Sequence, residues 1–453
     1  MSDDEADHVV TAFGRYDLLA LLSKSNVAEV WLARQRGMAG FEKLVVIKRL
    51  LARLSREPDY VDAFLDEARI NSRLQHTNVL QTYDLGQVDG QYFFAMEYLE
   101  GLPLGVMAQR ALSRLGDIPI AIAGGLVIQA ANGVHYAHQV VTPDGEPLQI
   151  VHRDLSPQNL LVSWEGILKV ADFASAKAEG RRARTKTGNV KGTPTYMSPE
   201  QVTGAPVDRR SDVFGLGIML WELLTGRRLF KRDTPEQTYD AITQQAPPAP
   251  STYRLELPAS IDHITLRALA RRPEDRYESA ADLATELEAE LHREGLRAEA
   301  MDVRSFLAKN FAPEHEAHER LLQRVRQGTY STRQAPLFRH AAHGLDSNEE
   351  LLVPTDEPFG DGDTERDLAE LVVAADVPVA ASQPPTELTP ALPAKKTSSL
   401  RLVVVLVLLA LAIALVVGAL IGRRHVHAAS LTVGKRHRTV GAPCRPDRSL
   451  APS

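Results

Sequence analysis

The sequence lacks several features that would assign a protein to a class. Its 453 residues include one cysteine, Cys444, so no internal disulfide can form and a cysteine-based zinc site is not expected. Residues 1–5 are acidic and no apolar core follows them, which argues against a secretory signal. The net charge of −6 argues against a general nucleic-acid-binding protein, so we expect no nucleic acid among the partners.

The remaining composition is typical of a globular protein. Hydrophobic residues make up 44% of the chain and charged residues 24%, which are ordinary values for folded domains. The length leaves room for about two or three domains. Composition therefore permits a soluble enzyme or binding domain but does not choose between them.

The residues with the clearest chemical meaning lie in a loop at 150–159, between two short apolar runs that predict strands. Asp154 and Asn159 lie five positions apart in it, far enough for one to face a substrate hydroxyl and the other a metal. A second carboxylate, Asp172, follows another β-like run. Upstream, Lys48 ends a run of valine and isoleucine.

In this order, the motifs resemble the set that marks the protein kinases: a strand lysine, a catalytic loop and a metal-binding Asp-Phe-Gly motif. The resemblance covers about residues 16–291. The chain is similar to the eukaryotic-like serine/threonine kinases of bacteria, in which Met-Ser-Pro-Glu-Gln commonly follows Gly-Thr-Pro-x-Tyr, as in residues 192–201. This resemblance implies an α+β, bilobal protein-kinase fold with a small β-rich N-lobe and a helical C-lobe.

The resemblance implies phosphoryl transfer from ATP and Mg²⁺ to serine or threonine hydroxyls of protein substrates, with autophosphorylation. Asp154 would orient the hydroxyl and accept its proton, and Asn159 and Asp172 would hold the metal. Lys48 would hold the phosphates and pair with Glu67. Apolar residues at helical spacing over residues 59–74 place Glu67 on the inward side of a helix.

The resemblance also implies a nucleotide site between the lobes. Adenine would bond to backbone groups of Glu97 and Leu99 in the hinge and lie among apolar side chains. The expected nucleotide-binding residues are Leu22, Ser23, Ser25, Val30, Val46, Lys48, Glu97, Leu99 and Leu161.

Regulatory and structural positions follow from the same resemblance. Arg153 precedes the catalytic aspartate, so a phosphate on Thr185 or Thr187 would pair with it and activate the enzyme. Both threonines lie among basic residues. The structural positions are an arginine that pairs with the glutamate of the Ala-Pro-Glu motif and an aspartate near the start of a helix: Arg276, Glu200 and Asp212.

Several positions depart from the family pattern. The phosphate loop lacks all three of its glycines, for which the small hydroxyl residues Ser23 and Ser25 partly compensate. Ser156 stands where most serine/threonine kinases have a lysine, and Ala174 replaces the glycine of Asp-Phe-Gly. Asn71 occupies a position where the family packs an apolar residue.

These departures keep two other functions open. One is a pseudokinase scaffold that binds partners, with or without nucleotide, and transfers no phosphate. The other is a small-molecule phosphotransferase, which shares the Asp and Asn loop. Residues 193–200 argue against the second, because this segment docks peptide substrates in the resembling family.

Changes in composition divide the chain into segments. We expect a disordered N-terminus at 1–12, the kinase N-lobe at 13–96, the C-lobe at 97–295, a helical extension at 296–327, a flexible acidic linker at 328–400, a transmembrane helix at 401–422 and a short basic tail at 423–453.

Within the expected membrane span, residues 402–421 form an unbroken apolar run of about 20 residues, which is long enough to cross a bilayer. Basic residues on both sides slightly favour the tail on the inner side, but a kinase needs ATP, so we expect the kinase domain in the cytoplasm. This makes a single-pass protein of the cell membrane. A homodimer through the span is suggested by small residues that recur every four positions: Ala410, Ala414, Gly418 and Gly422.

Overall fold

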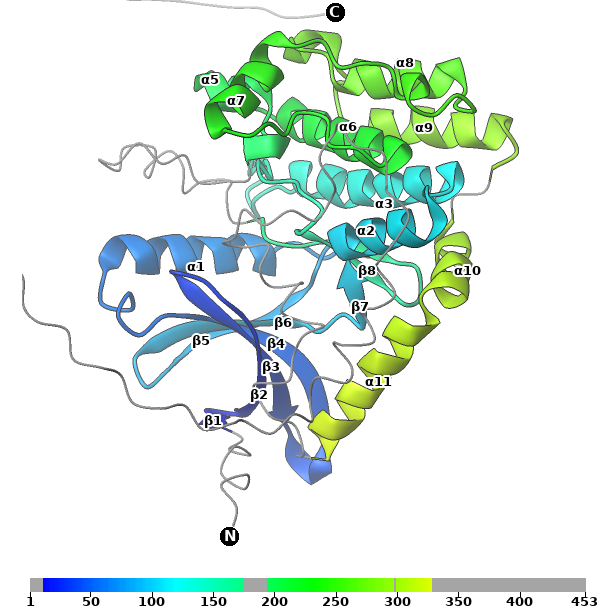
Figure 1. Cartoon of the computed structure of the whole chain (residues 1–453). Helices are drawn as coiled ribbons and strands as arrows, with labels where there is room; N and C mark the ends of the chain where they lie inside the picture. Colours follow the sequence, from blue (N-terminus) through cyan, green and yellow to red (C-terminus); the bar gives the residue numbers. More distant parts are fainter. Residues whose placement is uncertain (1–10, 174–193, 297–298, 328–453) are drawn as a thin grey trace, which may run out of the picture. The chain divides into compact units, whose positions relative to one another are not determined.

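The computed structural model describes residues 11–173, 194–296 and 299–327. Within these ranges a strand-rich lobe precedes a helical lobe, which confirms the predicted bilobal α+β fold (Figure 1). The predicted linker, membrane span and basic tail lie outside the described residues.

The N-lobe is built on an antiparallel sheet with the strand order β1-β2-β3-β4-β6-β5. Because side chains alternate along a strand, β4 buries Val45 and Ile47 on one face and turns Val46 and Lys48 to the other. The strands are β1 Thr11–Phe13, β2 Tyr16–Lys24, β3 Ala28–Arg36, β4 Glu42–Leu50, β5 Thr82–Val88 and β6 Gln91–Glu97.

Helix α1, Pro58–Ser72, is the helix predicted over residues 59–74. Pro58 starts it without cost, because a proline in the first turn needs no backbone N–H partner. Its buried face includes Phe64, Glu67 and Ala68, so Glu67 lies on the side that packs against the sheet. The ring of Phe64 lies 5.2 Å from that of Phe94 in β6, which fixes the helix on the sheet.

The C-lobe is helical, with a small sheet, β7-β8-β9, beside the hinge. The sheet strands are β7 Gly101–Pro103, β8 Leu160–Ser163 and β9 Leu168–Val170. The helices are α2 Leu104–Leu115, α3 Ile120–His138, α5 Pro199–Thr203, α6 Arg210–Thr225, α7 Pro235–Gln244, α8 Ala259–Ala268 and α9 Ala280–Arg293. Short 3₁₀ turns of the C-lobe lie at Pro194–Tyr196, Pro250–Thr252 and Pro273–Asp275, and a further one, Met38–Gly40, lies between β3 and β4 of the N-lobe.

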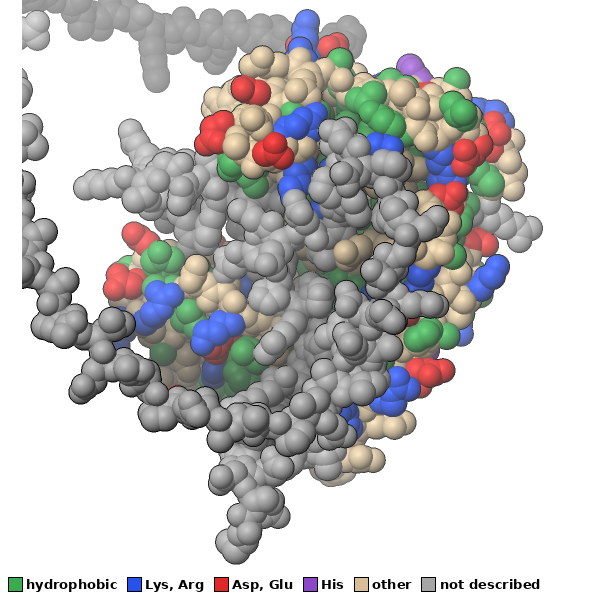
Figure 2. Space-filling view, viewed as in Figure 1, with side chains coloured by type: hydrophobic (Ala, Val, Ile, Leu, Met, Phe, Trp, Pro, Cys, Tyr) green, Lys and Arg blue, Asp and Glu red, His purple; other side chains and the backbone are tan. Residues whose placement is uncertain are grey.

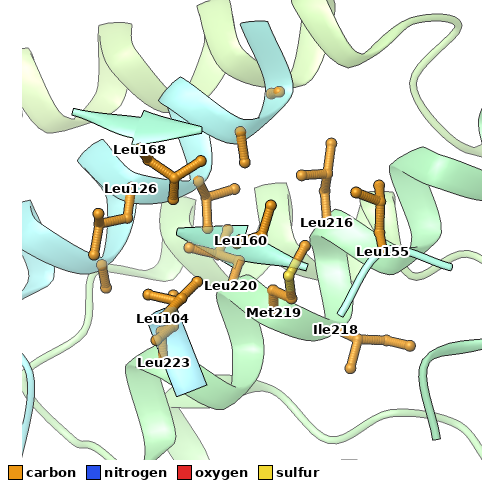
Figure 3. Packing of buried hydrophobic residues seen from close by; sticks show 14 of the residues in the cluster. Leu104, Leu126, Leu155, Leu160, Leu168, Leu216, Ile218, Met219, Leu220 and Leu223 are labelled. Atoms are coloured by element: carbon orange, nitrogen blue, oxygen red, sulfur yellow. The ribbon is translucent and has the colours of Figure 1, made fainter. Parts of the chain in front are cut away.

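The core of the C-lobe forms where α3 and α6 meet the small sheet (Figure 3). Leu126 of α3, Leu220 of α6 and Leu160 of β8 are all almost wholly buried there. Among the described residues, α3 alone is long and apolar enough to cross a membrane, and it is mostly buried inside this lobe. It is therefore a core helix.

Two further helices follow the C-lobe: α10 Ala300–Asn310 and α11 Ala312–Arg326. Helix α10 packs near α3, and α11 then runs beside the hinge toward the sheet of the N-lobe (Figure 1). On the face drawn in Figure 2, basic and acidic side chains of the described residues are interspersed. The helical extension thus returns the chain to the N-lobe, a placement that the sequence did not predict.

Candidate active site

Asp212, at the start of α6, holds the catalytic loop in place. Its two carboxylate oxygens accept hydrogen bonds from the backbone N–H groups of His152 and Arg153, each at 2.8 Å. Arg153 adopts a φ of 68°, a strained value for a residue with a side chain, and these bonds stabilise it there. Asp212 thus links the start of α6 to the backbone of the loop.

The same carboxylate is paired with His138 of α3. Asp212 Oδ2 lies 2.7 Å from His138 Nε2, and the side chains of both residues are 1% exposed. Burial would raise the pKa of Asp212, but its hydrogen bond to His138 and the charge of that residue hold it below its ordinary value. Asp212 is therefore ionised, and it joins α3, α6 and the catalytic loop.

Asp154 and Asn159 meet within the loop. The Asn159 amide nitrogen donates to the Asp154 carbonyl at 2.8 Å and to its carboxylate at 3.2 Å. The backbone carbonyl of Asn159 accepts from the N–H of Ala171, next to Asp172, at 2.8 Å. These bonds hold Asp154 beside Asn159 and attach the segment that carries Asp172 to the same loop.

Lys48 lies between two carboxylates. Its Nζ is 2.5 Å from Glu67 Oε1 and 3.1 Å from Asp172 Oδ1, so the β4 lysine joins α1 to the end of β9. Burial would lower the pKa of Lys48, but the charges of Asp172 and Glu67 outweigh it and raise the pKa above its ordinary value. Lys48 is therefore a fixed cation.

Asp172 has a φ of 59°, in the left-handed region. Such a conformation costs free energy for a residue with a Cβ and marks functional sites when the surroundings impose it. The ion pair with Lys48 contributes to that constraint. The next residue, Phe173, is wholly buried against His152 of the catalytic loop, with ring centroids 4.8 Å apart.

A cavity between the lobes is lined by residues of both. Eight of the nine residues expected to bind nucleotide line it: Leu22, Ser23, Val30, Val46, Lys48, Glu97, Leu99 and Leu161. Asn159 and Asp172 also line it, whereas Asp154 and Glu67 do not. The cavity thus combines apolar side chains with the ammonium group of Lys48, the carboxylate of Asp172 and the amide of Asn159.

Ser25 has a different place. Its hydroxyl oxygen accepts hydrogen bonds from the backbone N–H groups of Val27, at 3.0 Å, and Ala28, at 2.9 Å, and it is not among the cavity-lining residues. The turn between β2 and β3 therefore closes on Ser25 itself. None of its residues has a positive φ, which explains how the turn forms without glycine.

Two unusual positions of the sequence are buried and partnered. The amide nitrogen of Asn71 donates to the backbone carbonyl of Glu67 at 2.9 Å, which is how a polar side chain is accommodated there. Ser156 is 2% exposed, and its carbonyl accepts from the N–H of Asn159. Ala174, Thr185 and Thr187 lie outside the described residues.

Glu200 and Arg276 form a bidentate ion pair, with distances of 2.7 and 2.9 Å between their charged atoms. Burial would raise the pKa of Glu200, but the hydrogen bond and charge of Arg276 lower it. Nearby, the side chain of Gln201 donates to the carbonyl of Arg153 at 2.7 Å. The segment that begins at Pro194 is thus fixed to the catalytic loop.

The cavity is also lined by residues to which the sequence analysis gave no role, and those with long polar or aromatic side chains include Tyr98, Arg110, Trp164, Glu314 and His318. The last two belong to α11, more than two hundred positions from the hinge. The apolar spacing of Leu321, Leu322 and Val325 predicts a helix with one buried face but does not identify what that face covers.

Comparisons with known proteins identify the family. The protein kinase domain family matches residues 21–293, and the chain therefore belongs to the protein kinase family. It is similar to the tyrosine-protein kinase MasK of Myxococcus xanthus, with 39% identity over 77% of this chain and 52% of that protein. It is also similar to the serine/threonine-protein kinase PksC of Streptomyces coelicolor, with 34% identity over 61% of this chain and 49% of that protein.

PrkC, a serine/threonine-protein kinase of Bacillus subtilis, is 33% identical over 60% of this chain and 40% of its own length. The chain thus spans about half, or less, of the curated relatives that it matches. Among solved structures, the PknI kinase domain of Mycobacterium tuberculosis is 26% identical, over 62% of this chain and 98% of that one, with a TM-score of 0.48.

Proposed function

We propose that this chain is a protein kinase that transfers a phosphoryl group from Mg-ATP to serine or threonine hydroxyls, its own included. The observation that carries the proposal is Lys48, held between Glu67 and Asp172 in a cavity that Asn159 also lines. Binding of a nucleoside triphosphate requires a fixed cation beside oxygen atoms that can coordinate Mg²⁺, here those of Asn159 and Asp172.

The donor set fits a magnesium ion. Mg²⁺ prefers oxygen ligands, and its charge would neutralise the phosphates and the charge that develops during transfer. The amide nitrogen of Asn159 donates to Asp154, so its amide oxygen is the atom left for a cation. With the carboxylate of Asp172, this gives two oxygen-bearing side chains on the same cavity.

The other roles follow from position. Lys48 binds phosphate oxygens, while Glu67 keeps its side chain extended toward the cavity. Asp154 is bonded to Asn159, which lines the cavity, and its role is to orient the attacking hydroxyl and accept its proton. Val30, Val46 and Leu161 provide an apolar slot for the adenine ring.

The test is label transfer from γ-labelled ATP to the full-length chain and to a generic basic protein, in the presence of Mg²⁺. Asp154→Asn should abolish the label while leaving the melting temperature unchanged. Asp144→Asn is the matched control, because Asp144 is exposed in the turn after α3 and touches no part of the cavity.

The result distinguishes the candidate functions. If the wild-type chain binds nucleotide but gains no label, the result supports the pseudokinase scaffold and contradicts our proposal. Acid hydrolysis of labelled protein identifies the acceptor. Phosphotyrosine in place of phosphoserine and phosphothreonine would overturn the assignment to serine and threonine, a needed check because one similar relative is named a tyrosine kinase.

We also propose that residues 402–421 anchor the chain in the cell membrane, with the kinase domain in the cytoplasm. The apolar length of this segment supports the proposal. Wild type should sediment with membranes, and deletion of 402–421 should release it to the soluble fraction. A wild-type chain that is already soluble contradicts the anchor, and a deletion variant that is still dimeric contradicts a homodimer through the span.

A further inference from the structure

Helix α11 contacts the C-lobe at its first turn. The carboxylate of Glu314 lies 3.2 Å from a guanidinium nitrogen of Arg110 and 2.5 Å from one of Arg114, both on α2. Arg114 also donates to the carbonyl of Asn310, just before α11 begins. Glu314 is buried, so this is a shielded ion-pair cluster and not a surface pair.

The middle of α11 contacts the hinge. His318 Nε2 lies 2.9 Å from the hydroxyl of Tyr98, which directly follows β6. One turn earlier, the ring of His315 lies 4.9 Å from that of Trp164, which follows β8. Burial, and then the charge of His315, lowers the pKa of His318 to about 4. His318 is therefore neutral near pH 7.

The last turns of α11 contact the N-lobe. Leu321 and Val325 are buried in one cluster with Ala20 of β2 and Leu32 of β3. The helix therefore binds both lobes and the hinge between them, by an ion-pair cluster at one end and apolar packing at the other. Movement of the lobes relative to each other must break or deform one of these contacts.

These contacts lie at the cavity. Glu314, His318, Arg110, Tyr98 and Trp164 all line the space that Lys48 and Asp172 also line.

We propose that helix α11 is a wall of the nucleotide site, in which Glu314 and His318 act as positioning residues that hold the lobes at the separation a nucleotide requires. The identity of the ligand rests on the proposed kinase function. The residues of the wall are donors and acceptors suited to the hydroxyls and ring nitrogens of a nucleoside. Docking of α11 and nucleotide binding are then coupled, and each strengthens the other by the same factor.

Amide hydrogen exchange on the full-length chain tests the coupling, with the non-hydrolysable analogue adenylyl imidodiphosphate and Mg²⁺ as the probe. The nucleotide should slow exchange in Ala312–Arg326 as well as in β4 and β6. Slower exchange in β4 and β6 alone, with α11 unchanged, overturns the inference and leaves the proposed function intact. No change anywhere contradicts the proposed function and the inference together.

Nucleotide affinity and kinetics test the two residues. Glu314→Gln and His318→Leu should each raise the Kd of the analogue, and the KM for ATP, by about fivefold or more, as expected for a lost charge-assisted or buried hydrogen bond. His318→Gln, which can still bond to Tyr98, should recover much of the affinity. Glu316→Gln is the matched control, because Glu316 is exposed on the same helix.

A purely structural role would give a different pattern. In that case Glu314→Gln and His318→Leu would lower the melting temperature while the Kd of the folded protein stayed at the wild-type value. That result, or an equal effect of Glu316→Gln, overturns the inference.

Discussion

The segment that begins at Pro194 contains Glu200, whose buried ion pair with Arg276 attaches it to the C-lobe. Replacing Arg276 by methionine tests how much this pair stabilises the protein. The Arg276 side chain is 0% exposed and binds both carboxylate oxygens of Glu200. It also donates to the backbone carbonyls of Ala270, Arg210 and Arg271, so every part of the guanidinium is bonded. Methionine fills similar volume but supplies no donor.

The variant should lose stability because Glu200, the partner of Arg276, remains buried. Glu200 would keep its hydrogen bond from Ser211 but would be a buried carboxylate without a cation. Removal of one member of such a pair typically destabilises a protein by about 3–5 kcal/mol. For a domain of this size we expect a fall in melting temperature on the order of 10 °C. Kinase activity should fall with it, since the neighbouring Gln201 also bonds to Arg153.

Circular dichroism of the full-length chain during heating measures the change. Arg272→Met is the control, because Arg272 is exposed nearby and should leave the melting temperature unchanged. The double variant Glu200→Gln with Arg276→Met should be more stable than the sum of the single changes predicts, by about 1–3 kcal/mol. If Arg276→Met costs less than about 1 kcal/mol, or if the two changes are additive, the pair is not the stabilising element.

Three further predictions concern the site. Lys48→Met should reduce label transfer by about 100-fold or more, because it removes the cation between Glu67 and Asp172, while Lys309→Met on α10 should have no effect. Thr187→Ala should reduce activity if loop phosphorylation activates the enzyme, and an unchanged rate would remove that hypothesis. The third concerns His318, whose pKa is lowered to about 4 when α11 is docked. Protonation of His318 therefore favours the undocked helix. Docking should be strongest above about pH 6.5, where His318 is neutral in both states. As the pH falls from 6.5 to 4, docking should weaken by up to about 3 kcal/mol, seen as faster amide exchange in α11 that His318→Gln removes.

The parts of the site that the sequence predicts are those with local signals. Helical spacing predicts that Glu67 lies on the inward side of α1, and the resemblance to protein kinases implies its pairing with Lys48. The structure places their charged atoms 2.5 Å apart. The short loop between two strands likewise brings Asn159 to Asp154. The signal is local in both cases: the helical period for Glu67 and the short loop spacing for Asn159.

The parts that the sequence could not predict depend on contacts between distant segments. The contact of His318 with Tyr98 joins positions that are 220 residues apart, and no local pattern specifies that pair. The hydroxyl of Ser25 is a second case. Serine bonds readily to nearby backbone as well as to a ligand, and the choice between them depends on the conformation of the turn.

The turn at Ser25 and helix α11 together suggest how nucleotide binding is distributed over this site. In the turn, the backbone N–H groups of Val27 and Ala28 bond to Ser25, so they are not directed at phosphates. Helix α11 adds Glu314, beside the C-lobe, and His318, beside the hinge, to the wall of the cavity. Contacts to the nucleoside can thus offset weaker contacts to the phosphates and preserve affinity. Contacts that are equally strong before and during transfer do not lower the barrier, so this arrangement predicts slow turnover at ordinary nucleotide affinity.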